Sequence, residues 1–356
     1  MSPIPNYFSN PIIAGFAPDP SICVVPSRSS SSTETKTSYF LTTSTFNLFP
    51  SCAIHHSTDL LNWELIGHAL TRRSQIEMRT PEAGGGSWAS TLRYRVEDDG
   101  KGGRIGRWYL CRGVFSRYRP QMDEREGRWW AVLLGVRPVR DGDGKWLEPQ
   151  LGRETFLVGV EWIDDWPVFN GGKNVGISTE GPRGIVKMKM EKVWKADWGE
   201  RLELGWYEKN TPLKKGWSLT ERPGWLTIHG GCYDLKSPEA PTMLLRRQTA
   251  FEQVFSVVLD FKPKKAGGEK AVIFKIPTDV SDEFEEHLHT LEHDGPVALE
   301  IKATKMAYFV SIKNSRSGNM ATEVIVESKF MTKTPPVGQP FLGVMFGLYA
   351  FANWEP

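Results

Sequence analysis

"DDGKGGRIGRWY" (residues 98–109) and "DEREGRWW" (residues 123–130) each place a turn directly before a strand-like run that opens on aromatic residues. Similar short runs surround them, among them "TSYFLTTSTF" (37–46), "WELIGHAL" (63–70), "GRWWAVLLGVRPV" (127–139) and "ETFLVGVEW" (154–162). Runs rich in β-branched and aromatic residues, separated by Gly, Asp, Asn or Pro, are typical of β-strands. The repeat therefore predicts an all-β chain of the propeller or sandwich type.

A second region begins near residue 200. Runs such as "TMLLRRQTAFEQVFSVVLDFKP" (242–263) and "PVALEIKATKMAYFVSIKN" (296–314) predict further strands, arranged as a β-sandwich. "SDEFEEHLHTLEHDG" (281–295) breaks this pattern, because Phe284, Leu288 and Leu291 recur at helical spacing. With Ser281 as the first cap and Gly295 at the end, we expect a helix here.

The composition narrows the function. The chain has 356 residues and a formal net charge of +2 with no long basic run, which argues against a nucleic-acid partner. No apolar stretch approaches the roughly 20 residues of a membrane span. The N-terminus carries no secretory pattern, and the four cysteines (Cys23, Cys52, Cys111, Cys232) form no CxxC pair. We therefore expect a cytoplasmic protein with reduced thiols, and the oligomeric state stays open.

Two short motifs suggest metals. "HTLEH" (289–293) matches the H-x-x-E-H pattern of a zinc peptidase, with His289 and His293 one helical turn apart. Zinc needs a third protein ligand, for which the sequence offers no candidate, so a solvated helix face is the better interpretation. "DGDGK" (141–145) resembles half of a calcium loop but lacks the later ligands. We interpret it as a hairpin turn, and we expect no metal and no cofactor.

"GFAPDPSICVV" (15–25) places Asp19 between two prolines. Proline fixes its own φ and pushes the preceding residue toward extended conformations. This predicts a stiff, extended backbone at Asp19, which suits an acid that must point at one place. The alternative is a Pro-rich entry to a strand.

Several long segments together resemble glycoside hydrolase family 43, in its two-domain β-xylosidase and α-L-arabinofuranosidase branch. They are "NPIIAGFAPDPSI" (10–22), "TSTFNLFPSCAIHHSTDLLNWELIGHAL" (43–70), "SWASTLRY" (87–94), "GRWWAVLLGVRPV" (127–139), "LGRETFLVGVEWIDDWPVFNGG" (151–172) and "SLTERPGWLTIHG" (218–230). The resemblance implies a five-bladed β-propeller, here incomplete, over residues 1–195 and a concanavalin-like β-sandwich over residues 205–356. It also implies inverting hydrolysis of xylo- or arabino-oligosaccharides derived from hemicellulose, with the preferred sugar left open.

The resemblance carries roles over to single residues. Asp19 matches the general base, and Phe46 matches an aromatic wall of the sugar pocket, with a plain core residue as its alternative. Trp88 and Ala89 match a Trp-Ala pair that lines the same pocket. Arg153 matches an arginine that hydrogen-bonds the sugar, a task that suits its planar fork.

Four further positions lie in or beside the segments that carry the resemblance. The family usually has Pro where this chain has Ser90, so we expect a reshaped loop there. We interpret His55 and His56 as structural. Glu154 faces the opposite side of its strand from Arg153, which makes it a poor substitute acid.

The resemblance also shows a gap. The family has two further acids, an Asp that tunes the site and a Glu that serves as general acid, in the middle blades. Here "GRWYLCRGVFSRYRP" (106–120) runs almost directly into "QMDEREGRWW" (121–130), and the "EGP" at 180–182 lies outside the matching blades. The general acid is therefore unassigned, and we expect strands such as "WWAVLLGV" (129–136) to lack neighbours.

Three hypotheses follow from these observations. The first is a working glycosidase, and the second is a catalytically dead remnant that at most binds sugar. The third is the zinc peptidase based on "HTLEH".

Overall fold

The computed structural model shows an almost purely β-stranded chain that divides into two compact units. Unit 1 comprises 1–136, 152–247 and 337–356, and unit 2 comprises 137–151 and 248–336. The structure describes residues 7–28, 35–79, 81, 85–112, 121–125, 128–164, 166–188, 193–261, 271–277, 284–290, 295–314, 320–331 and 343–352.

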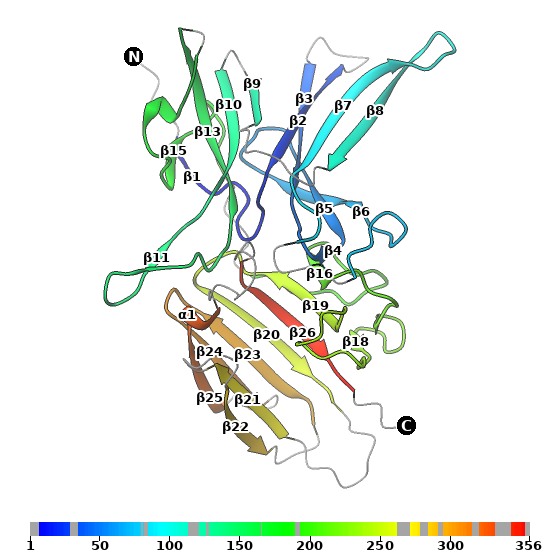
Figure 1. Cartoon of the computed structure of the whole chain (residues 1–356), viewed down its shortest axis with the longest axis vertical. Helices are drawn as coiled ribbons and strands as arrows, with labels where there is room; N and C mark the ends of the chain where they lie inside the picture. Colours follow the sequence, from blue (N-terminus) through cyan, green and yellow to red (C-terminus); the bar gives the residue numbers. More distant parts are fainter. Residues whose placement is uncertain are drawn as a thin grey trace. The chain divides into compact units, whose positions relative to one another are not determined.

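Each unit is built almost entirely from strands (Figure 1). Unit 1 holds β1 (Tyr7–Ser9), β2 (Ser21–Arg28), β3 (Thr35–Thr43), β4 (Leu48–Phe49), β5 (Ser51–Ser57), β6 (Glu64–Leu70), β7 (Ser90–Asp98), β8 (Arg104–Arg112), β9 (Gln121–Arg125), β10 (Arg128–Gly135), β13 (Glu154–Ile163), β14 (Trp166–Phe169), the 3-10 helix η1 (Asn170–Gly172), β15 (Ser178–Glu180), β16 (Trp206–Lys209), β17 (Trp217–Ser218), β18 (Thr227–Ile228), β19 (Thr242–Arg247) and β26 (Met345–Ala350). Unit 2 holds β11 (Val139–Arg140), β12 (Trp146–Leu147), β20 (Gln253–Leu259), β21 (Ala271–Pro277), β22 (Phe284–Thr290), β23 (Val297–Ala303), β24 (Ala307–Asn314), β25 (Met320–Glu327) and α1 (Ser328–Met331). The predicted all-β class is confirmed, and no helix in the described residues is long and apolar enough to cross a membrane.

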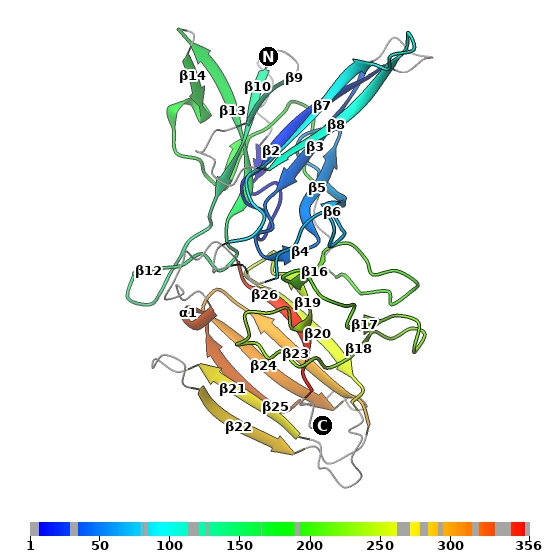
Figure 2. The same cartoon turned by 45° about the vertical axis from the view of Figure 1, so that its right-hand side comes forward.

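The first part of unit 1 is propeller-like, with sheets stacked face to face. The sheet β2-β3-β5-β6 lies between hairpin β7-β8 on one side and sheet β14-β13-β10-β9 on the other (Figures 1 and 2). Side chains alternate along β3, so Leu41 enters the core shared with Trp130 of β10 and Leu157 of β13. Phe40 points to the other face and meets Trp108 of β8, with ring centroids 4.6 Å apart. These two contacts hold neighbouring sheets together as blades.

The strand "WWAVLLGV" is well covered, so the expectation that it lacks neighbours is wrong for its central residues. Trp130 and Val132 pack into the core with sheet β2-β3-β5-β6, and Ala131 packs with Val158 and Val160 on the other face. Both faces of β10 are therefore buried despite the shortened sequence.

A second sheet of unit 1 joins residues that are far apart in the sequence. Its order is β26-β19-β16-β4, with Glu208 of β16 opposite Phe49 of β4. Next to this pair, the Asn210 amide donates to the carbonyl of Asn47 at 2.6 Å. Strands that begin after residue 205 are thus continuous with a short strand that follows Phe46, within one compact unit.

Unit 2 contains the four-stranded sheet β20-β23-β24-β25 and the hairpins β21-β22 and β11-β12. Val297, Ile312 and Val324 form the buried cluster of the four-stranded sheet. The predicted turn at "DGDGK" is confirmed, because the Asp141 amide donates to the Lys145 carbonyl at 2.9 Å and β11 pairs with β12.

The helix predicted for 281–295 is wrong. Phe284–Thr290 is strand β22, which pairs antiparallel with β21, and Val272 lies opposite His289. Cross-strand hydrogen bonds therefore replace the helical ones, and the helical register that "HTLEH" requires is absent at His289. Residues 278–283 and 291–294, which include His293, lie outside the described residues. In the described part of the chain, no three His, Cys, Asp or Glu side chains group as a metal site.

Candidate active site

Asp19 lies in a turn, not in the extended backbone that the flanking prolines predict. Its φ is 51°, in the left-handed region, so that prediction is wrong. Asp tolerates this region better than most residues, because its short polar side chain can bond locally. The turn is held where the Pro18 carbonyl accepts the Ser44 amide at 2.9 Å. The side chain of Asp19 is 17% exposed, so it remains open to a small ligand.

Ser44 connects Asp19 to the loop that carries Ala89. Its hydroxyl donates to Asp19 Oδ2 at 2.7 Å and accepts the backbone N–H of Ala89 at 2.7 Å. One hydroxyl serves both contacts, so its proton is directed at the carboxylate. This chain of bonds fixes the orientation of Asp19 relative to a second pocket segment.

Arg153, the residue directly before β13, faces Asp19. Its Nη1 lies 3.9 Å from Asp19 Oδ1, and its Cζ lies 5.0 Å from the centre of the Phe46 ring. The backbone adds a second link, since the Arg153 carbonyl accepts the Ala17 amide at 2.9 Å. Arg153 therefore joins the segment before Asp19 to the aromatic side of the pocket.

Phe46 and Trp88 belong to one aromatic cluster. Phe46 is 3% exposed and packs with Phe16, Leu48 and Tyr207, while half-buried Trp88 packs against the same group. The rings of Phe16 and Phe46 lie 5.8 Å apart and are tilted by 51°. Phe46 thus has the burial of a core residue and also contacts Arg153, and its role as a wall of the sugar pocket stays a prediction.

Three of the five predicted site residues have an unusual backbone. Asp19, Phe46 and Ala89 have φ values of 51°, 50° and 51°. Left-handed conformations at residues other than glycine cost about 1–3 kcal/mol each and gather at functional sites. At Phe46 the backbone is held by Ser87, whose amide and carbonyl both bond to it. The strain supports a site whose geometry is fixed before a ligand binds.

Ser90 begins β7 and is buried. Its hydroxyl lies 3.0 Å from the Cys52 Sγ, and Ser87 Oγ approaches the same sulfur at 3.5 Å. A proline at position 90 would lack this hydroxyl, so the loop of Trp88 and Ala89 has a local anchor that the resemblance does not provide.

Within the described residues, no contact identifies a second acid that could act together with Asp19. Glu154 is fully buried and accepts the Gly15 amide at 2.8 Å, which satisfies one of its oxygens within the structure. Glu180 lies on β15 and faces Arg128 at 3.2 Å. Burial raises the pKa of Glu208 to about 7, a value that suits a general acid. However, Tyr207 contacts the aromatic cluster, so the adjacent Glu208 points to the opposite face of β16.

Two histidines lie close to the aromatic cluster. Burial, with a smaller effect from the positive charge of Arg247, lowers the pKa of His55 to about 3 and that of His68 to about 4. The His68 ring stands edge-on to Tyr207 at 5.2 Å. His56 bonds Ser38 Oγ at 3.3 Å instead. These contacts are structural, as the sequence suggests for His55 and His56.

Sequence reasoning missed the second half of the chain as a contributor to the pocket. Tyr207 of β16 belongs to the cluster around Phe46, and Leu245 of β19 and Met345 of β26 pack against it. It also missed Ser44, although "TSTF" places Ser44 two residues before Phe46. No local sequence signal joins Phe46 to residues that lie 161 to 299 positions further along the chain.

Two family profiles match the chain. Glycosyl hydrolases family 43 matches residues 8–113, and the β-xylosidase C-terminal concanavalin A-like domain matches residues 198–356. A non-reducing end α-L-arabinofuranosidase of Bacteroides ovatus, BoGH43B, is 25% identical over 505 residues, covering 98% of this chain and 92% of the relative. Because that alignment is longer than the 356 residues of this chain, parts of the relative have no counterpart here.

Other relatives match over a smaller part. A β-xylosidase of Bacillus subtilis is 43% identical over 159 residues, which is 44% of this chain and 21% of the relative. A xylan 1,3-β-xylosidase of Vibrio is 38% identical over 157 residues, and this match spans 25% of that protein.

Solved structures share the fold over nearly the whole chain. The Bacteroides ovatus xyloglucan PUL GH43B superimposes with a TM-score of 0.70 at 22% identity, covering 97% of this chain and 96% of that one. A xylan β-1,4-xylosidase from Bacillus halodurans gives a TM-score of 0.65 at 18% identity, with 96% of each chain covered.

Proposed function

The chain belongs to glycosyl hydrolases family 43, and from this premise we propose that the Asp19 pocket takes the terminal pentose of a β-xyloside or an α-L-arabinofuranoside. The observation that carries the proposal is the position of Arg153, whose Nη1 lies 3.9 Å from Asp19 Oδ1 and whose Cζ lies 5.0 Å from the centre of the Phe46 ring. An aromatic face, a planar donor and a carboxylate are the groups that a small polyhydroxylated ring needs.

In this proposal Asp19 is the general base of an inverting hydrolysis. Its carboxylate takes a proton from a water molecule, the water oxygen bonds to the anomeric carbon, and the bond to the leaving group breaks. Inversion places the base and the general acid roughly 6.5–9.5 Å apart, with the water between base and sugar. Ser44 supports this role because its hydroxyl bond fixes the direction of one carboxylate oxygen.

Arg153, Phe46, Trp88 and Ala89 bind and orient the sugar. The guanidinium of Arg153 offers paired donors to ring hydroxyls while also facing Asp19. Ala89 presents backbone at a position that its bond to Ser44 fixes. These four residues suit both xylose and arabinose, so measurements with glycosides of both sugars decide which one is preferred.

The proposed turnover is slow for ordinary substrates. General acid–base help is typically worth 10²–10⁴-fold, and no general acid is assigned in this chain. A second candidate function, sugar binding without turnover, is favoured by one observation: parts of the 505-residue alignment with the arabinofuranosidase have no counterpart here.

A leaving-group series tests the proposal. A 2,4-dinitrophenolate leaves without a proton, whereas a phenolate needs one. We therefore expect the protein to hydrolyse 2,4-dinitrophenyl β-xyloside or the corresponding α-L-arabinofuranoside at least 100-fold faster than the phenyl glycoside, and Asp19→Asn to abolish the reaction.

Arg153→Lys serves as a further variant. Arg153→Lys keeps the charge but removes the fork, so it should raise KM more than it lowers kcat. Equal rates for both leaving groups, abolished by Asp19→Asn, would show that a general acid is present after all. No hydrolysis of the activated glycoside, together with measurable xylose or arabinose binding, would establish the binding function instead.

A further inference from the structure

Arg247, the last residue of β19, reaches the segment that carries Asp19. Its Nη1 donates to the carbonyl of Phe16 at 2.7 Å, across 231 positions of the sequence. Its Cζ also lies 5.8 Å from the centre of the Tyr207 ring. Within the residues that the structure describes, no carboxylate forms an ion pair with this guanidinium, so the Phe16 carbonyl is its principal polar contact.

The surroundings of Arg247 do not neutralise its charge. His55 and His68 both lie close enough for the charge of Arg247 to act with burial in lowering their pKa values, to about 3 and about 4. Two neutral imidazoles and an aromatic ring thus lie near this half-buried cation. Burying an unpaired charge is unfavourable, and an apolar side chain would fill such a space without that penalty. The presence of a guanidinium at this position is best explained by its hydrogen bond to the Phe16 carbonyl.

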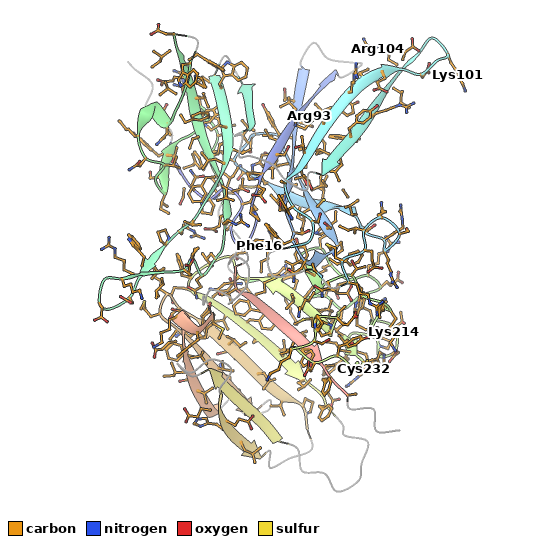
Figure 3. The ribbon with its side chains drawn as sticks, viewed as in Figure 1. Phe16, Arg93, Lys101, Arg104, Lys214 and Cys232 are labelled. Atoms are coloured by element: carbon orange, nitrogen blue, oxygen red, sulfur yellow. The ribbon has the colours of Figure 1, made fainter. Side chains whose placement is uncertain are left out.

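Arg247 binds the first residue of the segment 16–19, and each residue of this segment is hydrogen-bonded to another part of the chain. After Phe16, the Ala17 amide donates to the Arg153 carbonyl at 2.9 Å. The Ala17 carbonyl accepts a hydrogen bond from the Thr155 hydroxyl at 2.7 Å. Ser44 then binds Pro18 and Asp19. The Phe16 ring meanwhile packs on Phe46 (Figure 3 labels Phe16).

We propose that Arg247 is a positioning residue for the sugar pocket. By fixing the Phe16 carbonyl, it sets the path of residues 16–19 and so places Asp19 and Phe46 for the sugar. This inference rests on the proposed function for the identity of the ligand. It adds that the pocket depends on a side chain from the region that matches the concanavalin A-like domain.

The test uses three variants of the full chain. Arg247→Met removes the donor with similar bulk, and Arg247→Lys keeps one donor and the charge. Arg246→Met is the matched control, because Arg246 lies next door on β19 but stacks on Trp194, 3.4 Å from its ring centre. Binding of methyl β-xyloside and methyl α-L-arabinofuranoside is measured by calorimetry, and amide hydrogen exchange of Ala17 is measured by NMR.

For Arg247→Met we expect at least tenfold weaker glycoside binding and at least tenfold faster exchange at Ala17. Arg247→Lys should recover part of both, and Arg246→Met should change neither, even if its melting temperature falls. Wild-type values in Arg247→Met, or equal losses in Arg246→Met, overturn the proposal. If the wild-type protein binds neither glycoside, the proposed function fails, and the exchange rate of Ala17 alone still decides the role of Arg247.

Discussion

The two faces of strands β16 and β19 place ionisable groups in opposite settings. On the pocket face, Tyr207 and Arg247 lie with His68, whose pKa is lowered to about 4 by burial and by Arg247. On the other face, burial raises the pKa of Glu208 to about 7, although Trp217 Nε1 and Lys215 favour its charged form. The pKa values of His68 from β6 and Glu208 from β16 are therefore shifted in opposite directions.

The difference shows how one sheet can serve two purposes. Burial disfavours whichever form of a group is charged, so it lowers the pKa of a base and raises that of an acid. On the pocket face the group that stays charged is Arg247. Its guanidinium donates to the Phe16 carbonyl, in the segment that leads to Asp19. On the opposite face Glu208 is a neutral acid near pH 6, with an indole N–H as its partner at 3.3 Å.

The largest effect is expected for Tyr207→Ala. Tyr207 is 2% exposed and packs between Phe46 and the strands β19 and β26. Removing a buried aromatic ring typically costs about 3–5 kcal/mol, and the cavity lies directly behind Phe46. Urea unfolding should show this loss, with sugar binding lost as well. Tyr207→Phe keeps the ring and should cost less than about 1.5 kcal/mol. Equal stabilities of the two variants would mean that the ring does not support the pocket.

The pocket-face histidines should make the protein sensitive to acid. The pKa of His68 is lowered in the folded state, from 6.5 to about 4. Its contribution to stability is therefore complete above pH 6.5 and is lost as the pH falls through 4. At about 1.4 kcal/mol for each pKa unit, the loss is roughly 3 kcal/mol. His68→Phe keeps an aromatic ring beside Tyr207 but cannot titrate.

The measurement is the free energy of unfolding of both proteins between pH 7 and pH 4. As the pH falls, the free energy of unfolding of wild type should decrease relative to that of His68→Phe by roughly 3 kcal/mol. A constant gap would show that His68 is not held neutral by the fold.

On the opposite face the sign reverses. The pKa of Glu208 is raised from 4.5 to about 7, so its contribution is complete below pH 4.5 and is lost as the pH rises through 7. Glu208→Gln keeps an oxygen for Trp217 and removes the titration. We expect the variant to be more stable than wild type by roughly 3 kcal/mol at pH 8 and nearly equal at pH 4. Thermal unfolding at pH 4, 6 and 8 measures this, and a variant that is less stable at pH 8 would contradict it.

Four residues that the sequence analysis groups together do lie together in the structure, but the conformation predicted for Asp19 differs. Asp19, Phe46, Ala89 and Arg153 are joined through Ser44 and the Phe46 ring. The extended backbone predicted for Asp19 is wrong because the proline rule describes only adjacent residues, whereas the turn is held by Ser44, which follows β3.

Errors elsewhere have the same origin. The helical spacing in 284–291 was overridden by pairing with β21, a tertiary contact that the period cannot show. The bond from Arg247 to Phe16 joins segments 231 positions apart, so no window of sequence contains it. Turn chemistry is local, and there the prediction at "DGDGK" succeeded.

The smallest effect is expected for Glu180→Gln, at a carboxylate that lies on neither face of β16 and β19. Glu180 sits on β15 and faces Arg128 at 3.2 Å, with both side chains about half exposed. Exposed ion pairs contribute about 0.2–1 kcal/mol, so urea unfolding should change by no more than that. Arg128→Gln should give the same change, because either variant breaks the same pair. Hydrolysis of 2,4-dinitrophenyl and phenyl glycosides should be unaltered in both. If Glu180→Gln lowered only the rate with the phenyl leaving group, then Glu180 would be the missing general acid, and its place in an "EGP" segment would be functional after all.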